Sequence, residues 1–433
     1  WDRSRFDEAE RVLAEVAGVT VHIHDQACAA ENRRGRARGT TATPGFRVVI
    51  NERVCEGCGD CGDKSNCLSV QPHATPYGRK TQIHQNSCNF DFSCLDGDCP
   101  SFATVTVDAA KKVRRAKLEP PIDLPVPTSI VDADDFTIRL AGIGGTGVVT
   151  VSQVLGTAAM LGGLQVRGLD QTGLSQKAGP VVSELRITRT VSAMSNRANI
   201  SGIDCLLALD LLVAASDTNL VGVRSDRTVV IASTDAVPTG QMVTHPDIAA
   251  PDPSLLVERV SQVSRGDHNR FLDAAGLAEG LLGSTASANV IVLGAAVQAG
   301  VIPIPLDAIE QAIALNGVAV DTNIAAFRWG RAWALDPVGV ERSAGFVPQP
   351  APETIDELIE RLADDLADYQ SSAYAKRFRG TVDEARRAEQ ATGVTSTRFS
   401  EAVARNLHKL MAYKDEYEVA RLLLTSEARA GYE

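Results

Sequence analysis

The sequence predicts an α/β protein that also carries a separate cysteine-rich domain and a helical C-terminal region. Seven of the nine cysteines fall within residues 55–99. Apolar runs alternate with Ala-rich helical stretches over residues 134–345, a pattern typical of a parallel α/β sheet. The sequence from residue 346 onward is charged and has helical periodicity. The expected segments are an N-terminal piece with a basic linker (1–48), the cysteine-rich domain (49–117), a Pro-rich linker (118–133), the α/β domain (134–345) and the helical region (346–433).

Composition excludes several classes of protein. A length of 433 residues suits two or three domains. A net charge of -11 argues against a nucleic-acid-binding protein, which normally presents a basic face. No apolar run approaches the roughly 18 residues of a membrane span, and no signal-peptide pattern opens the chain. We therefore expect a cytoplasmic protein, and the opening at Trp1 within a helical pattern suggests a segment of a longer polypeptide.

The N-terminal segment predicts a helix followed by a short apolar strand over residues 19–24 (VTVHIH). The basic run 32–38 (NRRGRAR) and the Thr/Pro/Gly stretch 40–45 have the composition of a linker. A second linker, 118–130, is rich in proline and should be extended.

The clustered cysteines have the spacing of an iron–sulfur protein. In a large acidic chain without a secretory signal, such a cluster indicates metal binding rather than disulfides. Residues 55–61 (CEGCGDC) carry the Cys-x2-Cys-x2-Cys triple of a ferredoxin half-motif, and Cys67 follows five residues later. The second half has Cys88 and Cys94 with the same six-residue separation, and Cys99 directly before Pro100.

Asp91 occupies the place of the missing middle cysteine in the second half, which reads CNFDFSC. In two-cluster ferredoxins the last cysteine of each half ligates the other cluster. The spacing therefore predicts two crossed ligand sets: Cys55, Cys58, Cys61 and Cys99 for one cluster, and Cys88, Asp91, Cys94 and Cys67 for the other.

Several readings of these residues stay open. A carboxylate is a harder and weaker iron ligand than a thiolate, so the second site could be an Asp-ligated four-iron cluster, a three-iron cluster or a site open to water. Asp91 could instead be a solvent-facing turn residue. A structural zinc ion is the alternative metal, although a CxxCxxC triple leaves one ligand unused. Of the other cysteines, Cys205 and Cys28 are expected to be packed and inert.

A glycine-rich turn opens the α/β domain. Residues 136–155 predict a strand, a Gly-x-Gly-x-x-Gly turn at Gly142, Gly144 and Gly147, and a helix. Such a turn lets a phosphate approach the backbone at the helix N-terminus. The next strand ends in Asp170, roughly where a dinucleotide fold places its ribose-binding acid. The motif alone fits NAD or FAD, and also fits a tight turn without a ligand.

Four stretches together resemble one family. GIGGTGV…GLDQTGLSQKAGPVVSELRI resembles the gamma domain of 2-oxoacid:ferredoxin oxidoreductases. INERVCEGCGDCGDKSNCLSVQP with CNFDFSCLDGDCPSF resembles the ferredoxin-like domain of the fused indolepyruvate ferredoxin oxidoreductase. VHIHDQACAAENRRGRARG resembles the end of that family's thiamine-diphosphate domain, and KLMAYKDEYEVARLLL its C-terminal helical region. The resemblance implies a ferredoxin-like 4Fe-4S domain and a Rossmann-like gamma domain with a parallel sheet.

The family's reaction is the oxidative decarboxylation of a 2-oxo acid, here an aryl pyruvate such as indolepyruvate. Thiamine diphosphate with Mg carries the decarboxylation, electrons leave singly through iron–sulfur clusters to ferredoxin, and coenzyme A takes the acyl group. This chain lacks the family's GDG…NN thiamine signature, so the resemblance assigns it the electron-exit and acyl-acceptor half and no catalytic residue. Residues implied for coenzyme A are Gly142, Gly144, Gly145, Gly147, Thr172, Ser175, Gln176 and Lys177.

The resemblance also implies partners: ferredoxin, a thiamine-diphosphate domain on the same or another chain, and a second copy in a homodimer. The basic run at Arg33, Arg34, Arg36 and Arg38 is a candidate docking patch for an acidic ferredoxin. Two other hypotheses remain at this point. One is a ferredoxin-fused NAD or FAD oxidoreductase, and the other is a non-catalytic electron-transfer subunit.

Overall fold

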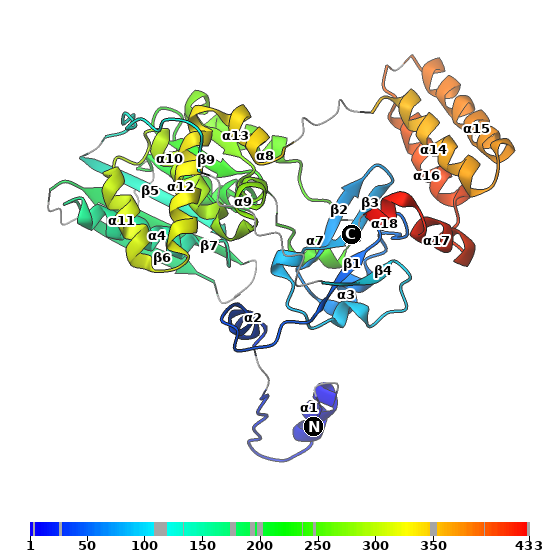
Figure 1. Cartoon of the computed structure of the whole chain (residues 1–433), viewed down its shortest axis with the longest axis horizontal. Coiled ribbons are helices and arrows are strands. Elements are labelled where there is room, and N and C mark those ends of the chain that lie inside the picture. Colours follow the sequence, from blue (N-terminus) through cyan, green and yellow to red (C-terminus); the bar gives the residue numbers. More distant parts are fainter. Residues whose placement is uncertain are drawn as a thin grey trace.

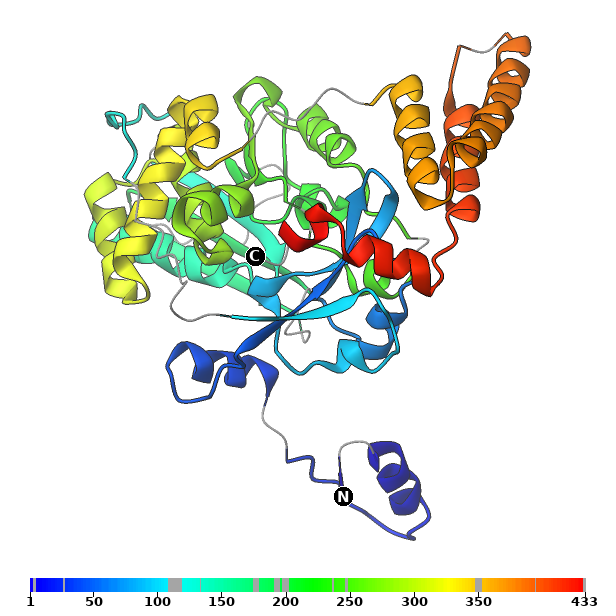
Figure 2. The same ribbon diagram turned by 45° about the vertical axis from the view of Figure 1, so that its right-hand side comes forward.

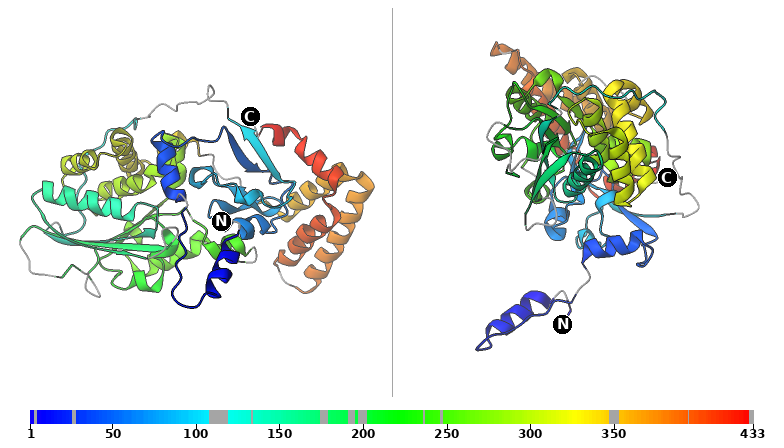
Figure 3. Two further views of the ribbon diagram at one scale, coloured as in Figure 1. Left: turned by 90° about the horizontal axis from the view of Figure 1, so that it is seen from below. Right: turned by 90° about the vertical axis from the view of Figure 1, so that its left-hand side faces the viewer.

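The computed structural model describes most of the chain: residues 1–2, 5–25, 28–107, 119–132, 134–173, 179–190, 195–196, 202–235, 237–245, 248–346, 353–393 and 395–430. Figure 1 shows three parts, an α/β part, a cysteine-rich part and a set of C-terminal helices. The cysteine-rich part lies between the other two in Figure 1 and in the left view of Figure 3.

The α/β part is built on a six-stranded sheet of order β10-β9-β8-β5-β7-β6. Its strands are β5 (Asp135–Ile143), β6 (Gln165–Thr172), β7 (Pro180–Thr188), β8 (Cys205–Ala208), β9 (Val229–Ser233) and β10 (Arg270–Leu272). Strands β5, β8, β9 and β10 are parallel, as the sequence predicts. The prediction of a parallel sheet holds only in part, because β7 runs antiparallel to both β5 and β6. The connection 173–179 is too short for the crossover that parallel strands require, so β6 and β7 form a hairpin.

Helices cover both faces of this sheet. One face packs Phe136, Ile138 and Leu140 against α4 (Val148–Leu161) and the pair α10 (Ala288–Gln298) and α12 (Val320–Leu335). The other face packs Ala141 of β5 against residues of the shorter helices. Further helices of this part are α5 (Leu211–Ala214), α6 (Asp217–Leu220), α7 (Gly240–Thr244), α8 (Pro253–Val263), α9 (Ala274–Leu282), α11 (Leu306–Asn316) and α13 (Pro337–Ser343), with η5 (Gly266–His268) and η6 (Thr285–Ser287).

Two glycines let α10 and α12 approach closely. A Cβ at Gly294 would overlap the carbonyl oxygen of Phe327, and a Cβ at Gly330 would overlap that of Ile291. Side chains larger than hydrogen would therefore push the two helices apart, and the buried core between them would lose its packing.

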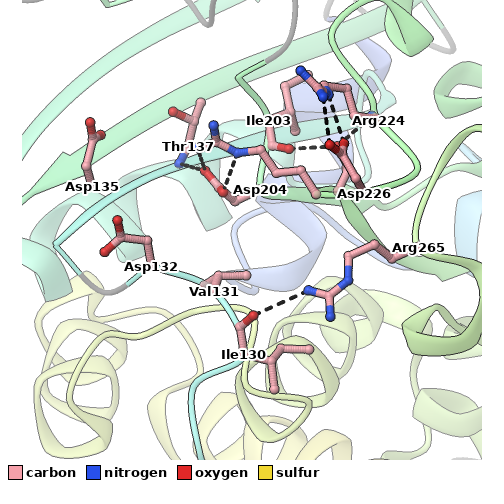
Figure 4. Close-up of polar contacts among 12 residues, drawn as sticks. Ile130, Val131, Asp132, Asp135, Thr137, Ile203, Asp204, Arg224, Asp226 and Arg265 are labelled. Carbon is pink, nitrogen blue, oxygen red and sulfur yellow. Dashed lines mark hydrogen bonds and ion pairs between the residues drawn. The ribbon is translucent and has the colours of Figure 1, made fainter.

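A buried carboxylate ties the sheet to its surroundings (Figure 4). Asp204, just before β8, accepts hydrogen bonds from the Thr137 backbone N–H at 2.8 Å and from Arg227 Nε at 2.7 Å. Arg265 Nη1 donates to the carbonyl oxygen of Ile130 at 3.3 Å, which fixes the end of the Pro-rich linker. The described residues of that linker, 119–132, have neither helix nor strand, in agreement with the predicted extended segment.

The cysteine-rich part contains two antiparallel strand pairs. The first pairs β1 (Phe46–Ile50) with β4 (Phe102–Thr106), and the second pairs β2 (Val70–Thr75) with β3 (Gly78–Ile83). Its short helices are α3 (Asp60–Ser65), η2 (Gln85–Ser87) and η3 (Ser93–Leu95). Its core includes Val48, Val70 and Ile83, together with Val243, which α7 contributes from the α/β part.

The C-terminal region is helical, as predicted. Its helices are α14 (Ile355–Tyr369), α15 (Ser372–Ala391), α16 (Arg398–Met411), α17 (Glu416–Leu423) and α18 (Ser426–Ala430). Thr354 and Glu357 form a capping box at the start of α14. Leu362, Leu366 and Phe378 are almost fully buried between α14 and α15, so this region has an apolar core of its own.

The N-terminal segment contains the predicted helix but neither the predicted strand nor the predicted linker. Helix α1 (Phe6–Ala14) extends away from the rest of the molecule (Figures 1 and 2). Residues 19–24 are not a strand, and Val19 is 97% exposed, because no described strand pairs with this segment. The basic run is a helix rather than a linker, α2 (Ala29–Ala37). Within the part of the chain that the structure describes, no helix is both long and apolar enough to cross a bilayer.

Candidate iron–sulfur site and glycine loop

The first cysteine loop follows β1 and is shaped by glycines. Gly57 and Gly59 have φ values of 66° and 86°, on either side of Cys58. The Gly57 N–H donates to Cys55 Sγ at 3.3 Å, so the backbone turns toward the sulfur. A Cβ at Gly57 would overlap the carbonyl oxygen of Arg79 on β3. Position 57 therefore requires glycine both for its positive φ and because a larger side chain has no room.

The second cysteine loop has the same backbone shape without glycines. Phe90 and Phe92 have φ values of 57° and 59°, on either side of Asp91. The Phe90 N–H donates to Cys88 Sγ at 3.4 Å, which repeats the bond in the first loop. Asp91 therefore occupies the position that Cys58 occupies in the first loop, and both side chains are exposed.

Asp91 also makes the contacts of a turn residue. Its Oδ1 accepts hydrogen bonds from the Ser93 backbone N–H at 3.3 Å and from the Ser93 hydroxyl at 3.1 Å. Its Oδ2 accepts no hydrogen bond from the residues that the structure describes. One oxygen therefore stabilises the loop, while the other is available to a ligand.

The cysteines of each loop share their surroundings with a cysteine from the opposite half. Burial, followed by the charges of Cys55, Cys58 and Cys99, raises the pKa of Cys61 to about 11. Burial, followed by the charges of Cys88, Cys67 and Asp91, raises the pKa of Cys94 to about 11. These neighbours are the members of the two crossed sets that the spacing predicts, while ligation itself stays a prediction.

The described residues show no ready site for a single metal ion. Among the described residues, no three His, Cys, Asp or Glu side chains converge closely enough to hold one metal ion. Four thiolates around an iron–sulfur cube stand farther apart than four around one zinc ion. The raised thiol pKa values mean that ligation would release protons and would need the positive charge of iron to stabilise the thiolates.

The other two cysteines lie apart from these sets. Cys205 on β8 is fully buried and its pKa is raised by burial, as expected of an inert thiol. The prediction that Cys28 is packed is wrong, because Cys28 is exposed just before α2.

Arginines surround the second loop. The guanidinium groups of Arg36 and Arg47 lie 5.2 and 4.7 Å from the centre of the Phe90 ring. Arg36 Nη1 also donates to the carbonyl oxygen of Asn89 at 2.8 Å. Arg34 pairs with Glu31 at 2.7 Å. The basic run therefore directs Arg36 toward the second loop, and ferredoxin docking by its other arginines stays a prediction.

The α/β part touches the first loop directly. Arg79 Nη2 donates to the carbonyl oxygen of Met242 at 2.5 Å. A Cβ at Gly62 would lie 2.7 Å from the carbonyl oxygen of Val243, so α7 is in close contact with α3. The sequence carries no signal of this contact, because about 180 residues separate its two sides and the side at residues 240–244 has no recognisable motif.

The glycine loop joins β5 to α4. Gly145 and Gly147 have φ values of 103° and 81°, and a Cβ at Gly147 would overlap the amide of Asn289 on α10. A Cβ at Gly142 would lie 2.8 Å from Val148. Gly142 and Gly147 therefore serve tight packing, whereas Gly145 has nothing within 4 Å. This arrangement fits a tight turn without a ligand and is also compatible with a phosphate site.

The connection between β6 and β7 begins beside this loop. The Gly144 N–H donates to the carbonyl oxygen of Gly179 at 2.8 Å, so this N–H is already used. Thr172, the exposed last residue of β6, pairs in register with Val181. Ser175, Gln176 and Lys177 lie outside the described residues.

Asp170 does not take the place of a ribose-binding acid. Its Oδ1 accepts hydrogen bonds from Ser183 Oγ at 2.5 Å and from Ser152 Oγ at 3.2 Å. Strand β7 also separates β6 from β5, whereas a dinucleotide fold places its second strand directly beside the first. This arrangement argues against the NAD or FAD alternative.

Two families match this chain, one over the α/β domain and one over the C-terminal helices. Residues 137–333 match the family described as pyruvate ferredoxin/flavodoxin oxidoreductase. Residues 355–433 match a family of unknown function. The chain is 28% identical over 206 residues to an indolepyruvate oxidoreductase subunit IorB of Pyrococcus horikoshii, covering 45% of this chain and 94% of that subunit. The same subunit of Thermococcus kodakarensis is 24% identical over 213 residues, or 48% of this chain and 99% of that subunit.

Solved structures give a distant likeness. Pyruvate oxidoreductase subunit PORC of Thermotoga maritima shares 23% identity and a TM-score of 0.33, over 46% of this chain and 96% of that one. The 2-oxoglutarate:ferredoxin oxidoreductase of Magnetococcus marinus shares 17% identity and a TM-score of 0.35, over 47% of this chain and 31% of that one.

Residues 137–333 therefore form an α/β domain that is similar to a family of oxidoreductases. The curated relatives that this part of the chain matches are indolepyruvate oxidoreductase subunits.

Proposed function

We propose that this chain forms the electron-exit and acyl-acceptor part of an oxidoreductase that converts an aryl pyruvate such as indolepyruvate to its acyl-CoA. The observation that carries the proposal is the pairing of the two cysteine loops with cysteines from the opposite half. Cys61 lies within electrostatic range of Cys55, Cys58 and Cys99, and Cys94 within that of Cys88, Cys67 and Asp91. The names of the curated relatives support the choice of substrate.

The proposed ligands are the two crossed sets: Cys55, Cys58, Cys61 and Cys99 for the first cluster, and Cys88, Asp91, Cys94 and Cys67 for the second. Such clusters supply reversible one-electron transfer when bound. The Gly57 and Phe90 N–H groups donate to the sulfurs of Cys55 and Cys88, and so stabilise negative charge there. Partial burial of Cys61 and Cys94 limits the access of water.

The acyl-acceptor role rests on the glycine loop. We assign the phosphates of coenzyme A to the backbone around Gly142, Gly144, Gly145 and Gly147, with Thr172, Ser175, Gln176 and Lys177 beside them. The open N-terminus of α4 supports this assignment, because Gly147 leaves the first N–H groups of α4 without a side-chain cap. The contact of Val243 with Gly62 supports a coupling between this domain and the first cysteine loop.

The remaining partners complete the proposal. Thiamine diphosphate and Mg would belong to another domain, on the same or another chain, where decarboxylation takes place. Ferredoxin would accept the electrons, and the assembly would be a cytoplasmic homodimer.

The test of the cluster assignment is the iron and sulfide content of the reconstituted chain, together with low-temperature EPR. About eight irons per chain is expected for two four-iron clusters and about seven for a three-iron site at Asp91. A content of about four irons per chain would mean that only one cluster is present. Absence of sulfide would contradict the proposal.

The acyl-acceptor role has a separate test. Calorimetry with the full chain should detect binding of coenzyme A. If coenzyme A did not bind, the acyl-acceptor role would be wrong and only the electron-transfer role would stand. Bleaching of the clusters by NADH would instead favour a dinucleotide-dependent enzyme.

A further inference from the structure

A cavity of about 180 Å³ lies between the cysteine-rich part and the C-terminal helices. The β2–β3 hairpin forms one wall, and α16 and α17 form the other. Arg53 binds Asp365 at 2.6 Å across this boundary, and Arg405 donates to the carbonyl oxygen of Pro76 at 3.1 Å. Lys414 reaches the carbonyl oxygen of Cys55 at 3.2 Å. These contacts join the two walls, so the cavity is a built feature of the boundary.

The lining of the cavity is basic. Its basic side chains are Arg53, Arg79, Lys80, Arg405, Lys409 and Lys414, and its acidic side chains are Glu56, Asp365 and Glu418. The acids all have cationic partners: Glu56 binds Lys414 at 2.9 Å, Asp365 binds Arg53, and Glu418 binds Arg421 at 2.7 Å. Each acid of the lining therefore already has a cationic partner, and Glu56 acts on Lys80 only through its charge, without an ion pair.

Lys80 is the central residue of this lining. It is 6% exposed, and among the described residues it has neither an ion pair nor a side-chain hydrogen bond. Lys409, on the opposite wall, likewise has no such partner within the described part of the chain. A buried ammonium group without a partner is unfavourable.

We propose that this cavity binds a small dianion, either a phosphate group or a dicarboxylate, between Lys80 and Lys409, with Arg405 at the rim. A dianion would supply the negative charge that the lining lacks. The volume is below the roughly 300–1,000 Å³ of pockets for drug-sized ligands, so the occupant is smaller than a nucleotide. Lys414 lines the cavity and also donates to the carbonyl oxygen of Cys55. Binding of a dianion would therefore also affect the first cysteine loop. The effect on the first cysteine loop rests on the proposed electron-transfer function, whereas the binding itself does not.

The test is calorimetry of the full chain with inorganic phosphate and, in a second arm, malonate. One of the two dianions should bind more tightly than the monoanion acetate. The tighter of the two shows whether the cavity prefers a phosphate group or a dicarboxylate. Lys80→Met keeps the apolar stem and should weaken binding about tenfold to a hundredfold, the loss expected for a charged hydrogen bond. Lys409→Gln on the exposed wall should weaken it in the same direction and carries little risk to folding.

The matched control is Lys376→Gln, which removes an equal charge from an exposed site on α15 outside the cavity. Its affinity should equal that of the wild-type chain. The proposal is overturned if neither dianion binds at millimolar concentration, or if Lys409→Gln binds as tightly as Lys376→Gln. Iron content plays no part in this measurement, so its outcome is independent of the cluster assignment.

Discussion

The two cysteine loops, 55–61 and 88–94, share one backbone shape and differ in chemistry. Gly57 and Gly59 adopt left-handed conformations in the first loop, and Phe90 and Phe92 adopt them in the second. Each first cysteine accepts a hydrogen bond from the N–H two residues later. Since phenylalanine does not favour this backbone, the shape of the second loop must be held by its surroundings.

The surroundings supply that support. A bulky residue in the left-handed region costs about 1–3 kcal/mol. Phe92 stacks on Phe46 with ring centres 4.8 Å apart, and Phe90 lies against two arginines. These contacts offset the strain and leave Asp91 where Cys58 stands in the first loop. The second loop therefore keeps the backbone position of Cys58 but places a carboxylate there instead of a thiol.

The largest expected effect comes from removing a cysteine that crosses between the halves. Cys99→Ser should abolish the cluster of the first loop, with a loss of about four irons. Cys67→Ser should abolish that of the second loop, with a loss of about four irons, or about three if that site holds a three-iron cluster. EPR of the remaining cluster identifies which loop has lost its metal. If Cys99→Ser instead affected the signal of the second loop, the crossed assignment would be wrong.

Asp91→Cys makes the second loop chemically equal to the first. A thiolate binds iron more firmly than a carboxylate, so the variant should gain about one iron if the wild-type site holds three, or resist oxidation better if it holds four. Iron analysis and EPR after exposure to air check this. Asp96→Cys, an exposed position in the same segment, is the control and should change neither. An unchanged signal in Asp91→Cys would make Asp91 a turn residue only.

Much of this comparison could be predicted from the sequence, because cysteine spacing is a local property. The spacing placed Asp91 opposite Cys58, and the apolar runs predicted the parallel strands β5, β8 and β9. The antiparallel β7 depends on a short connection whose path the apolar pattern does not encode. The contact of Val243 with Gly62 and the cavity at Lys80 join residues far apart in sequence, so no local pattern could reveal them.

Gly57→Ala tests why the first loop keeps glycine. The added methyl group would meet both the left-handed strain and the carbonyl oxygen of Arg79. Gly78→Ala is the matched control, because Gly78 also has a positive φ, 91°, and nothing within 4 Å. Both should lower the free energy of unfolding by about 1 kcal/mol through strain, and Gly57→Ala by about 1–3 kcal/mol more through overpacking. Chemical denaturation measures the difference, and equal losses would show that the loop accommodates the methyl group.

The smallest expected effect concerns the charge beside the second loop. Arg36→Gln removes a cation that contacts Phe90 and Asn89, so the second cluster, once reduced, should be less stabilised and its reduction potential should fall by tens of millivolts. Arg33→Gln removes the same charge from an exposed position on α2 and should leave the potential near the wild-type value. Redox titration followed by EPR measures both variants. A fall of equal size in the two would mean that only net charge matters, whereas a fall confined to Arg36→Gln would show that the contact of Arg36 with the second loop tunes the potential of its cluster.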